Sequence, residues 1–202
     1  MNKFIILIIG CAFSIGGFGQ AIDYHPAQLL KDIQKLNGSV TLEDMVIQEI
    51  LLPKARIVDE GKYYNVWNNT TEKYINYLYI GRVNSCRAGG CNIDRPLNPG
   101  ETTEYFDYYI LYDPECKIKQ VRVYNYQASH GQEVTAKNWL KQFIGFDDKS
   151  SLRVGKNVDA ISGATISVYA ITNDIESKTL VMKKLIDNCQ AVELERASLS
   201  AH

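Results

Sequence analysis

Two β-type segments joined by a short turn constrain the fold of this 202-residue chain more than any other feature. Residues 105–112 and 118–126 are rich in Tyr, Ile and Val, which fit a pleated, half-buried surface. The turn between them begins with Asp113-Pro114, a pair that favours a reversal of the chain. Successive side chains of a strand point to opposite faces, and here the apolar ones share a face: Val121 and Val123 on one side, Arg122 and Tyr124 on the other. The pattern predicts an antiparallel hairpin with one face on a core.

The segments around this hairpin complete an α+β pattern. Two further β-rich stretches precede it, at residues 62–67 and 74–83, while residues 42–52 suit either a helix or a strand. Three stretches carry the apolar spacing of amphipathic helices: residues 26–36, 135–144 and 165–187. We expect a single domain with a twisted, mainly antiparallel sheet and packed helices, and a C-terminal tail, residues 188–202, that frays.

The first 19 residues have the pattern of an export signal. A basic start at Lys3 precedes an apolar stretch over residues 4–18, which is shorter than the roughly 20 residues that cross a bilayer. We expect cleavage after Gly19 and an exported protein, periplasmic or on the cell surface. Two alternatives would leave the protein membrane-associated: a retained N-terminal anchor, or a lipid on Cys11 within a lipobox-like sequence.

Charge and histidine usage argue against two classes of partner. The net charge is −1, with acidic and basic residues interspersed, so there is no basic patch for nucleic acid. The three histidines, at positions 25, 130 and 202, are too scattered to predict a metal site. We therefore expect neither a nucleic-acid partner nor a bound metal.

A long loop, residues 84–104, contains Cys86 and Cys91. Loops of that length inside a compact domain are usually functional or disordered. In an oxidising compartment the pair is expected to form a disulfide. Two interpretations of the pair stay open: a structural disulfide that rigidifies the loop, or a redox or binding module.

The segment with the most chemical information is Val158-Asp159-Ala160-Ile161-Ser162-Gly163-Ala164-Thr165. It reads as a turn of small residues that leads into the 165–187 helix, with hydroxyl groups at the helix start. Unpaired backbone N–H groups and the helix dipole favour a phosphate there, and Gly163 allows close approach of a ligand. On spacing alone, small residues with Ser or Thr before a helix usually form an ordinary N-cap.

The residues Asp159-x-x-Ser162-Gly163-Ala164-Thr165 resemble the signature of the FMN-binding domain family. That domain occurs in the C subunit of the sodium-pumping NADH:quinone reductase, in the G subunit of Rnf-type complexes and in free-standing exported flavoproteins. The resemblance implies that Thr165 carries FMN through a phosphoester bond. It also implies a flavin transferase as a partner, which takes FMN from FAD with a metal ion, and recognition by Asp159, Ser162, Gly163 and Ala164.

The resemblance covers about residues 105–187, so residues 20–104 form an N-terminal part outside it. One departure concerns a Glu-Thr-Pro-Gly turn of the family, which corresponds here to Ala128-Ser129-His130-Gly131. Only the glycine is kept, yet the position makes His130 and Gly131 candidates for the flavin side of the site; His130 is equally readable as a loop residue without a role. Tyr126 and Trp139 are further candidate neighbours of the flavin.

These features favour an exported carrier of one or two electrons with covalent FMN, working with a redox partner protein or a membrane electron-transfer complex. The chain has no glycine pattern for a nicotinamide cofactor, which favours an electron-transfer protein over a complete enzyme. The alternatives are a non-covalent FMN site and a module built on the Cys86/Cys91 loop.

Overall fold

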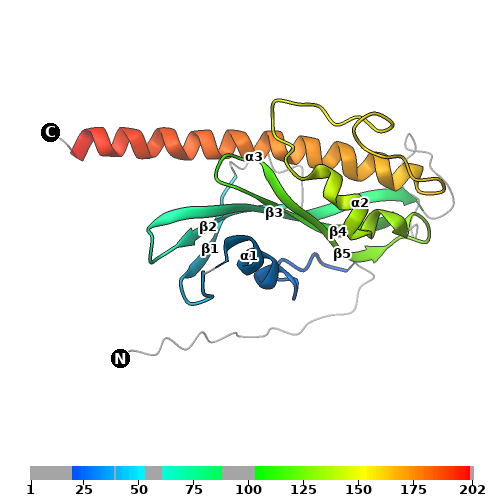
Figure 1. Cartoon of the computed structure of the whole chain (residues 1–202), viewed down its shortest axis with the longest axis horizontal. Coiled ribbons are helices and arrows are strands. Elements are labelled where there is room, and N and C mark those ends of the chain that lie inside the picture. The colour runs from blue at the N-terminus through cyan, green and yellow to red at the C-terminus, as the bar shows by residue number, and fades with distance from the viewer. Residues whose placement is uncertain (1–19, 39, 53–60, 88–102, 201–202) are drawn as a thin grey trace.

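The computed structural model describes residues 20–38, 40–52, 61–87 and 103–200, and these form one antiparallel sheet with helices on both faces (Figure 1). The strands lie in the sheet in the order in which they occur in the chain, and each neighbouring pair is antiparallel. They are β1 Met45–Ile50, β2 Lys62–Asn68, β3 Lys73–Arg87, β4 Thr103–Tyr112 and β5 Ile118–Gln127. The predicted α+β class and all four predicted β segments are confirmed, and the ambiguous 42–52 stretch is a strand.

The hairpin of β4 and β5 turns where the sequence predicted. The side chain of Asp113 accepts the backbone N–H of Glu115 at 3.1 Å and that of Lys117 at 2.8 Å, which holds the turn closed. In β5, Val121 packs into a hydrophobic cluster on one face of the sheet, whereas Tyr124 packs against a second, smaller cluster on the opposite face. The predicted alternation of faces is confirmed.

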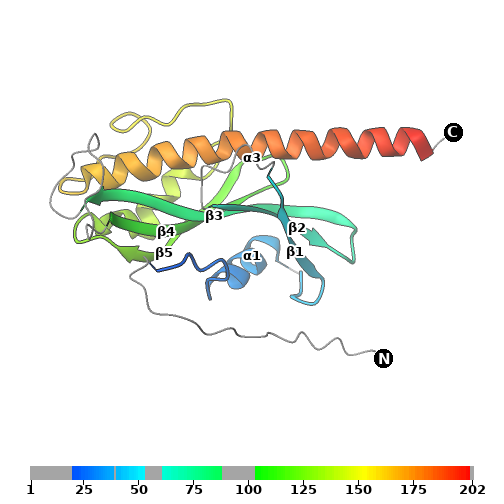
Figure 2. The same cartoon turned by 180° about the vertical axis from the view of Figure 1, so that it is seen from behind.

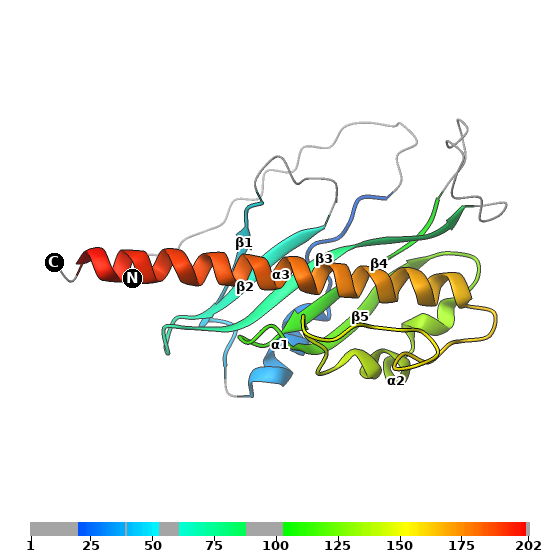
Figure 3. The ribbon, with the colours of Figure 1, turned by 90° about the horizontal axis from the view of Figure 1, so that it is seen from above.

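Two cores lie on opposite faces of the sheet. The larger is covered by the long helix α3, Thr165–Ser200, and by the segment around α2, Lys137–Leu140; the smaller is covered by α1, Leu29–Asn37. Figure 2 shows α1 and α3 on opposite sides of the strands, and Figure 3 shows α3 running along the sheet and beyond its end. Fully buried side chains come mainly from the central strands: Leu78, Tyr79, Ile80, Tyr108, Tyr109, Ile110 and Leu111.

A buried ionic cluster fixes α1 to its face of the sheet. Asp32 of α1, 6% exposed, accepts hydrogen bonds from Arg122 Nε at 2.6 Å and from the Tyr109 hydroxyl at 2.5 Å, and also from Gln120. The polar positions of β5 thus pair with a carboxylate instead of facing water. α1 ends at Asn37, just before Gly38 with φ 60°, close to the predicted stop.

Two helix predictions need correction. Residues 135–144 do not form one helix: a 3₁₀ turn at Gln132–Thr135, the single-turn α2 and a 3₁₀ turn at Lys141–Phe143 follow one another. The chain is extended at Ala136 (ψ 122°) and at Ile144 (ψ 131°), and Gly145 then donates its N–H to Ile118 O of β5 at 2.8 Å. The helical residues therefore end at Phe143, one residue before the predicted end, and the departure from the prediction is the break into three short pieces. In contrast, the tail predicted to fray is helical to Ser200.

Several predictions concern residues outside the described ranges. These are the signal peptide over residues 1–19 and Cys91, so cleavage, export and the Cys86–Cys91 disulfide stay predictions. The loop is shorter than predicted, since β3 continues to Arg87 and β4 begins at Thr103. Among the described residues, no helix has both the length and the apolar character needed to cross a membrane.

Candidate cofactor-binding site

The last residue of the 159–165 signature, Thr165, is also the first residue of α3. The N–H of Val168 donates to Ala164 O at 2.9 Å, which closes the first turn of the helix. The N–H groups of residues 165–167 precede that bond, so they have no partner within the helix. The first turn also contains no acidic residue, so no carboxylate of α3 itself offsets the positive end of the helix dipole. This helix end is suited to an anion.

The turn before Thr165 exposes the side chains of Ser162 and Thr165 and buries that of Ala164. Gly163 has φ 82°, a left-handed conformation that an L-residue rarely adopts. Ala164 is 2% exposed and lies in the larger core, whereas Ser162 and Thr165 are exposed. The buried methyl group therefore fixes the turn while Thr165 stays accessible.

A second set of contacts holds the signature from the side of α2. The indole N–H of Trp139 donates to Asp159 O at 2.9 Å, and the Asp159 N–H donates to Gln142 Oε1 at 2.6 Å. Trp139 also packs edge-on against Phe143, with ring centroids 5.3 Å apart. The structure therefore places Trp139 where it supports the signature, and it does not line the pocket beside Thr165.

The turn after β5 packs directly against the first turn of α3. A Cβ atom added to Gly131, whose φ is 86°, would lie 2.6 Å from Ser167 Oγ and 3.1 Å from the Tyr126 hydroxyl. That hydroxyl donates to His130 O at 2.5 Å and lies 3.3 Å from Ser167 Oγ. Only glycine allows this approach, which explains why the glycine is the one residue of the family turn kept here.

These two turns enclose a pocket of about 340 Å³. It brings together five of the predicted site residues, whereas Asp159 and Ser162 are exposed outside its lining. The lining residues are Ser85, Glu104, His130, Gly131, Gly163, Ala164, Thr165, Ile166 and Ser167.

Sequence reasoning missed the β-sheet side of this pocket. Glu104 accepts the backbone N–H of Ser129 at 3.2 Å, and the Ser129 hydroxyl lies 2.8 Å from His130 Nδ1, so Glu104 holds the turn that carries His130. Ser85 and Glu104 lie within the stretch predicted as a long loop, residues 84–104, and belong to β3 and β4 in the structure; the length of that predicted loop was the available signal. Within the described ranges, no three His, Cys, Asp or Glu side chains gather as a metal-binding group.

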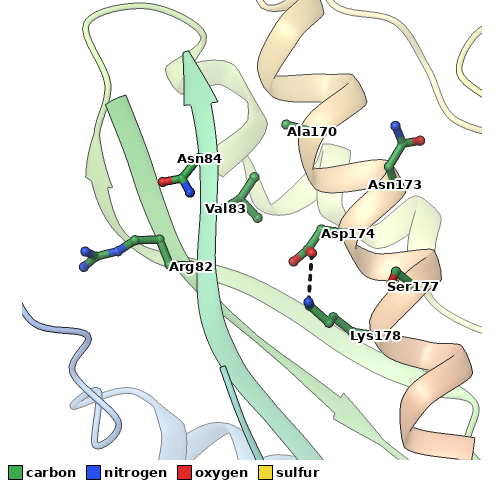
Figure 4. A pocket seen from close by; sticks show the side chains of 8 residues that line it. All are labelled: Arg82, Val83, Asn84, Ala170, Asn173, Asp174, Ser177 and Lys178. Carbon is green, nitrogen blue, oxygen red and sulfur yellow. Dashed lines mark ion pairs between the residues drawn. The ribbon is translucent and has the colours of Figure 1, made fainter. Parts of the chain in front are cut away.

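A second pocket, of about 530 Å³, continues along the same side of α3 (Figure 4). Its lining comes from β3 and α3, at positions next to those that line the first pocket. The lining residues are Arg82, Val83, Asn84, Ala170, Asn173, Asp174, Ser177 and Lys178. Asp174 accepts the Tyr108 hydroxyl at 2.6 Å and pairs with Lys178 at 3.3 Å. Burial raises the pKa of Asp174 to about 6, against a smaller opposing effect of the Tyr108 hydrogen bond, and burial lowers the pKa of Lys178.

Comparison with known families agrees with this geometry. The family model described as "FMN-binding domain" matches residues 105–177, a range that contains the β4–β5 hairpin, the turn at His130 and Gly131, the signature and the first turns of α3. Comparison with curated proteins and with solved structures gave no significant match. Residues 105–177 therefore match the FMN-binding domain family, and this domain indicates FMN as the cofactor.

Proposed function

We propose that this chain is an exported flavoprotein that carries FMN through a phosphoester on Thr165 and passes electrons outside the cytoplasm. The observation that carries the proposal is the place of Thr165. It is exposed, at the first position of α3, and it lines the pocket that also contains His130 and Gly131.

The residues around Thr165 fit a ribityl phosphate. Backbone N–H groups of the first turn are free of intrahelical bonds, and that turn carries no carboxylate; the carboxylate in the pocket lining, Glu104, belongs to β4. Gly163 and Gly131, one in each of the two turns that border the pocket, have no side chain that would occupy it. A phosphate ester on the Thr165 hydroxyl would therefore lie at the positive end of α3.

Covalent attachment suits an exported carrier. A flavin held only by hydrogen bonds can dissociate, and little FMN is available outside the cytoplasm to replace it. The ester leaves the isoalloxazine ring unaltered, so the cofactor supplies one- and two-electron chemistry while the protein holds and orients it. The transferase expected to form this ester needs access to Asp159 and Ser162, and the exposure of both residues supports that role.

The test is the mass and absorbance of the full-length protein, co-expressed with a flavin transferase and exported. We expect a yellow protein that keeps its flavin after denaturation and is heavier by one FMN less one water. Thr165→Ala should lose both the colour and the added mass. Thr71→Ala, at an exposed threonine that is distant from Thr165 in the sequence, should keep both.

A colourless wild-type protein of unmodified mass, in cells whose transferase modifies another substrate, would refute covalent attachment. Peptide mapping that places the added mass on a residue other than Thr165 would refute the assignment of the site. Recovery of the mature N-terminus at Gln20 from the exported fraction would support cleavage after Gly19.

A further inference from the structure

The second pocket contains a cluster of titratable side chains that attachment of FMN does not use. Asp174 projects from α3 towards the sheet, where the Tyr108 hydroxyl donates to one carboxylate oxygen and Lys178 pairs with the other (Figure 4). The carboxylate keeps 22% of its side-chain surface exposed and lines a pocket of about 530 Å³. It is therefore held in a largely dry environment that solvent protons can still reach.

This cluster follows the cofactor pocket along the same helix face. Ser167 of the first pocket and Asp174 of the second are seven residues apart, which is two turns, so their side chains share a face of α3. On β3, Ser85 lines the first pocket and its neighbour Asn84 lines the second, so the two pockets are adjacent on this strand as well. Thr165 and Asp174 are separated by about 14 Å of helix rise, a span that an extended ribityl chain with its ring can cover.

The tyrosines near Asp174 do not compete with it for protons near neutral pH. Burial raises the pKa of each surrounding tyrosine well above its ordinary value. Arg82 lines the pocket but points away from α3 in Figure 4 and pairs with Asp107 at 2.7 Å. The groups that face Asp174 are Tyr63 from β2, Tyr79 from β3, Tyr108 and Tyr112 from β4, and Lys178 from α3.

We propose that Asp174 is a proton-exchange group for the flavin, taking up one proton from solvent when the cofactor gains electrons and releasing that proton when the electrons leave. The inference rests on the proposed function, since it requires flavin in the groove between β3 and α3. The electrons come from the redox partner, the proton comes from water, and the added negative charge of the reduced cofactor is what raises the proton affinity of the carboxylate. Proton uptake forms the O–H bond of Asp174 and breaks an O–H bond of a solvent hydronium ion, and proton release reverses both changes.

The test is the midpoint potential of the FMN-loaded full-length protein as a function of pH. In the wild type, the potential should become more strongly dependent on pH above about pH 6, the pKa of Asp174 before electrons enter. Asp174→Asn should lose this additional dependence. Asp187→Asn, at an exposed carboxylate of the same helix that pairs with Lys183, should keep it.

A second variant separates proton exchange from a structural role. Tyr108→Phe keeps the ring but removes the hydrogen bond that favours the ionised carboxylate, so the pH at which the additional dependence begins should rise. Infrared difference spectra give an independent reading: reduction should produce the band of a protonated carboxyl group in the wild type and not in Asp174→Asn.

The outcomes distinguish the two proposals. A yellow protein whose potential has the same pH profile in the wild type and in Asp174→Asn overturns this inference alone. A colourless protein overturns the proposed function, and this inference with it.

Discussion

The close approach of Gly131 to α3 provides a direct test of how the pocket is built. In Gly131→Ala the new methyl group would meet Ser167 Oγ at 2.6 Å, and the residue would be held at φ 86°. The left-handed conformation costs an L-residue about 1–2 kcal/mol, and forcing an extra methyl group into a packed contact costs about 1–3 kcal/mol. We therefore expect Gly131→Ala to lower the free energy of unfolding by about 2–5 kcal/mol.

Gly145 offers a matched control, because its φ is 88° and a Cβ there would have no neighbour within 4 Å. Gly145→Ala should therefore show the backbone cost alone, about 1–2 kcal/mol. Urea unfolding of the two variants and the wild type measures the difference, provided that the slopes with denaturant agree. Adding Ser167→Ala to Gly131→Ala should recover part of the loss, which a double-mutant cycle would detect. Equal losses in Gly131→Ala and Gly145→Ala would refute the packing of the turn against α3.

Three further predictions concern buried polar groups. Asp32→Asn should cost about 3 kcal/mol, the low end for a broken buried pair because Arg122 keeps some contact with water. Burial acts to raise the pKa of Asp32, but hydrogen bonds from Arg122 and Tyr109 outweigh it and hold the pKa below its ordinary value. The stability from this carboxylate is therefore present above about pH 4 and lost as pH falls further. The stabilities of the wild type and Asp32→Asn, measured by acid unfolding, should converge at low pH. Asp174→Asn should have the opposite pH dependence. Because burial raises the pKa of Asp174 to about 6, the wild type loses stability as pH rises from about 4 to above 6. The stability of the variant should depend less on pH over that interval, and thermal unfolding at pH 5 and pH 7.5 measures the difference. Tyr79→Phe should leave stability unchanged or raise it by about 1 kcal/mol, since the buried Tyr79 hydroxyl has no hydrogen-bond partner among the described residues; a loss above about 1 kcal/mol in urea unfolding would contradict this.

The elements that the sequence predicts well are those with local signals. The Asp113-Pro114 turn and the alternation of Val121 with Arg122 identify the β4–β5 hairpin, and both depend only on neighbouring residues. The 135–144 helix prediction holds only in part, because residues 137–143 are helical but Ala136 is extended and the segment changes from α to 3₁₀ geometry. Apolar spacing locates the buried face of this segment but does not reveal these breaks in the backbone.

The candidate site divides in the same way. The signature around Thr165 is readable from sequence because its seven positions are contiguous. The contributions of Ser85 and Glu104 are not, since they come from strands about 60 to 80 residues earlier in the chain that meet α3 only in the folded sheet. Asp174 reads in the sequence as one polar position of an amphipathic helix, and only its contact with Tyr108 of β4 distinguishes it.

The order of the elements along the chain bears on when the cofactor can bind. Each strand pairs with the next one in sequence, so the sheet can assemble progressively as the chain emerges. The pocket forms later, because α3, which supplies Thr165, follows all five strands in the chain, and the turn at Gly131 that faces it comes directly after β5. An enzyme that recognises the assembled pocket would therefore modify only chains that have finished folding, which would make flavin loading a late step of maturation and a check on the quality of the fold.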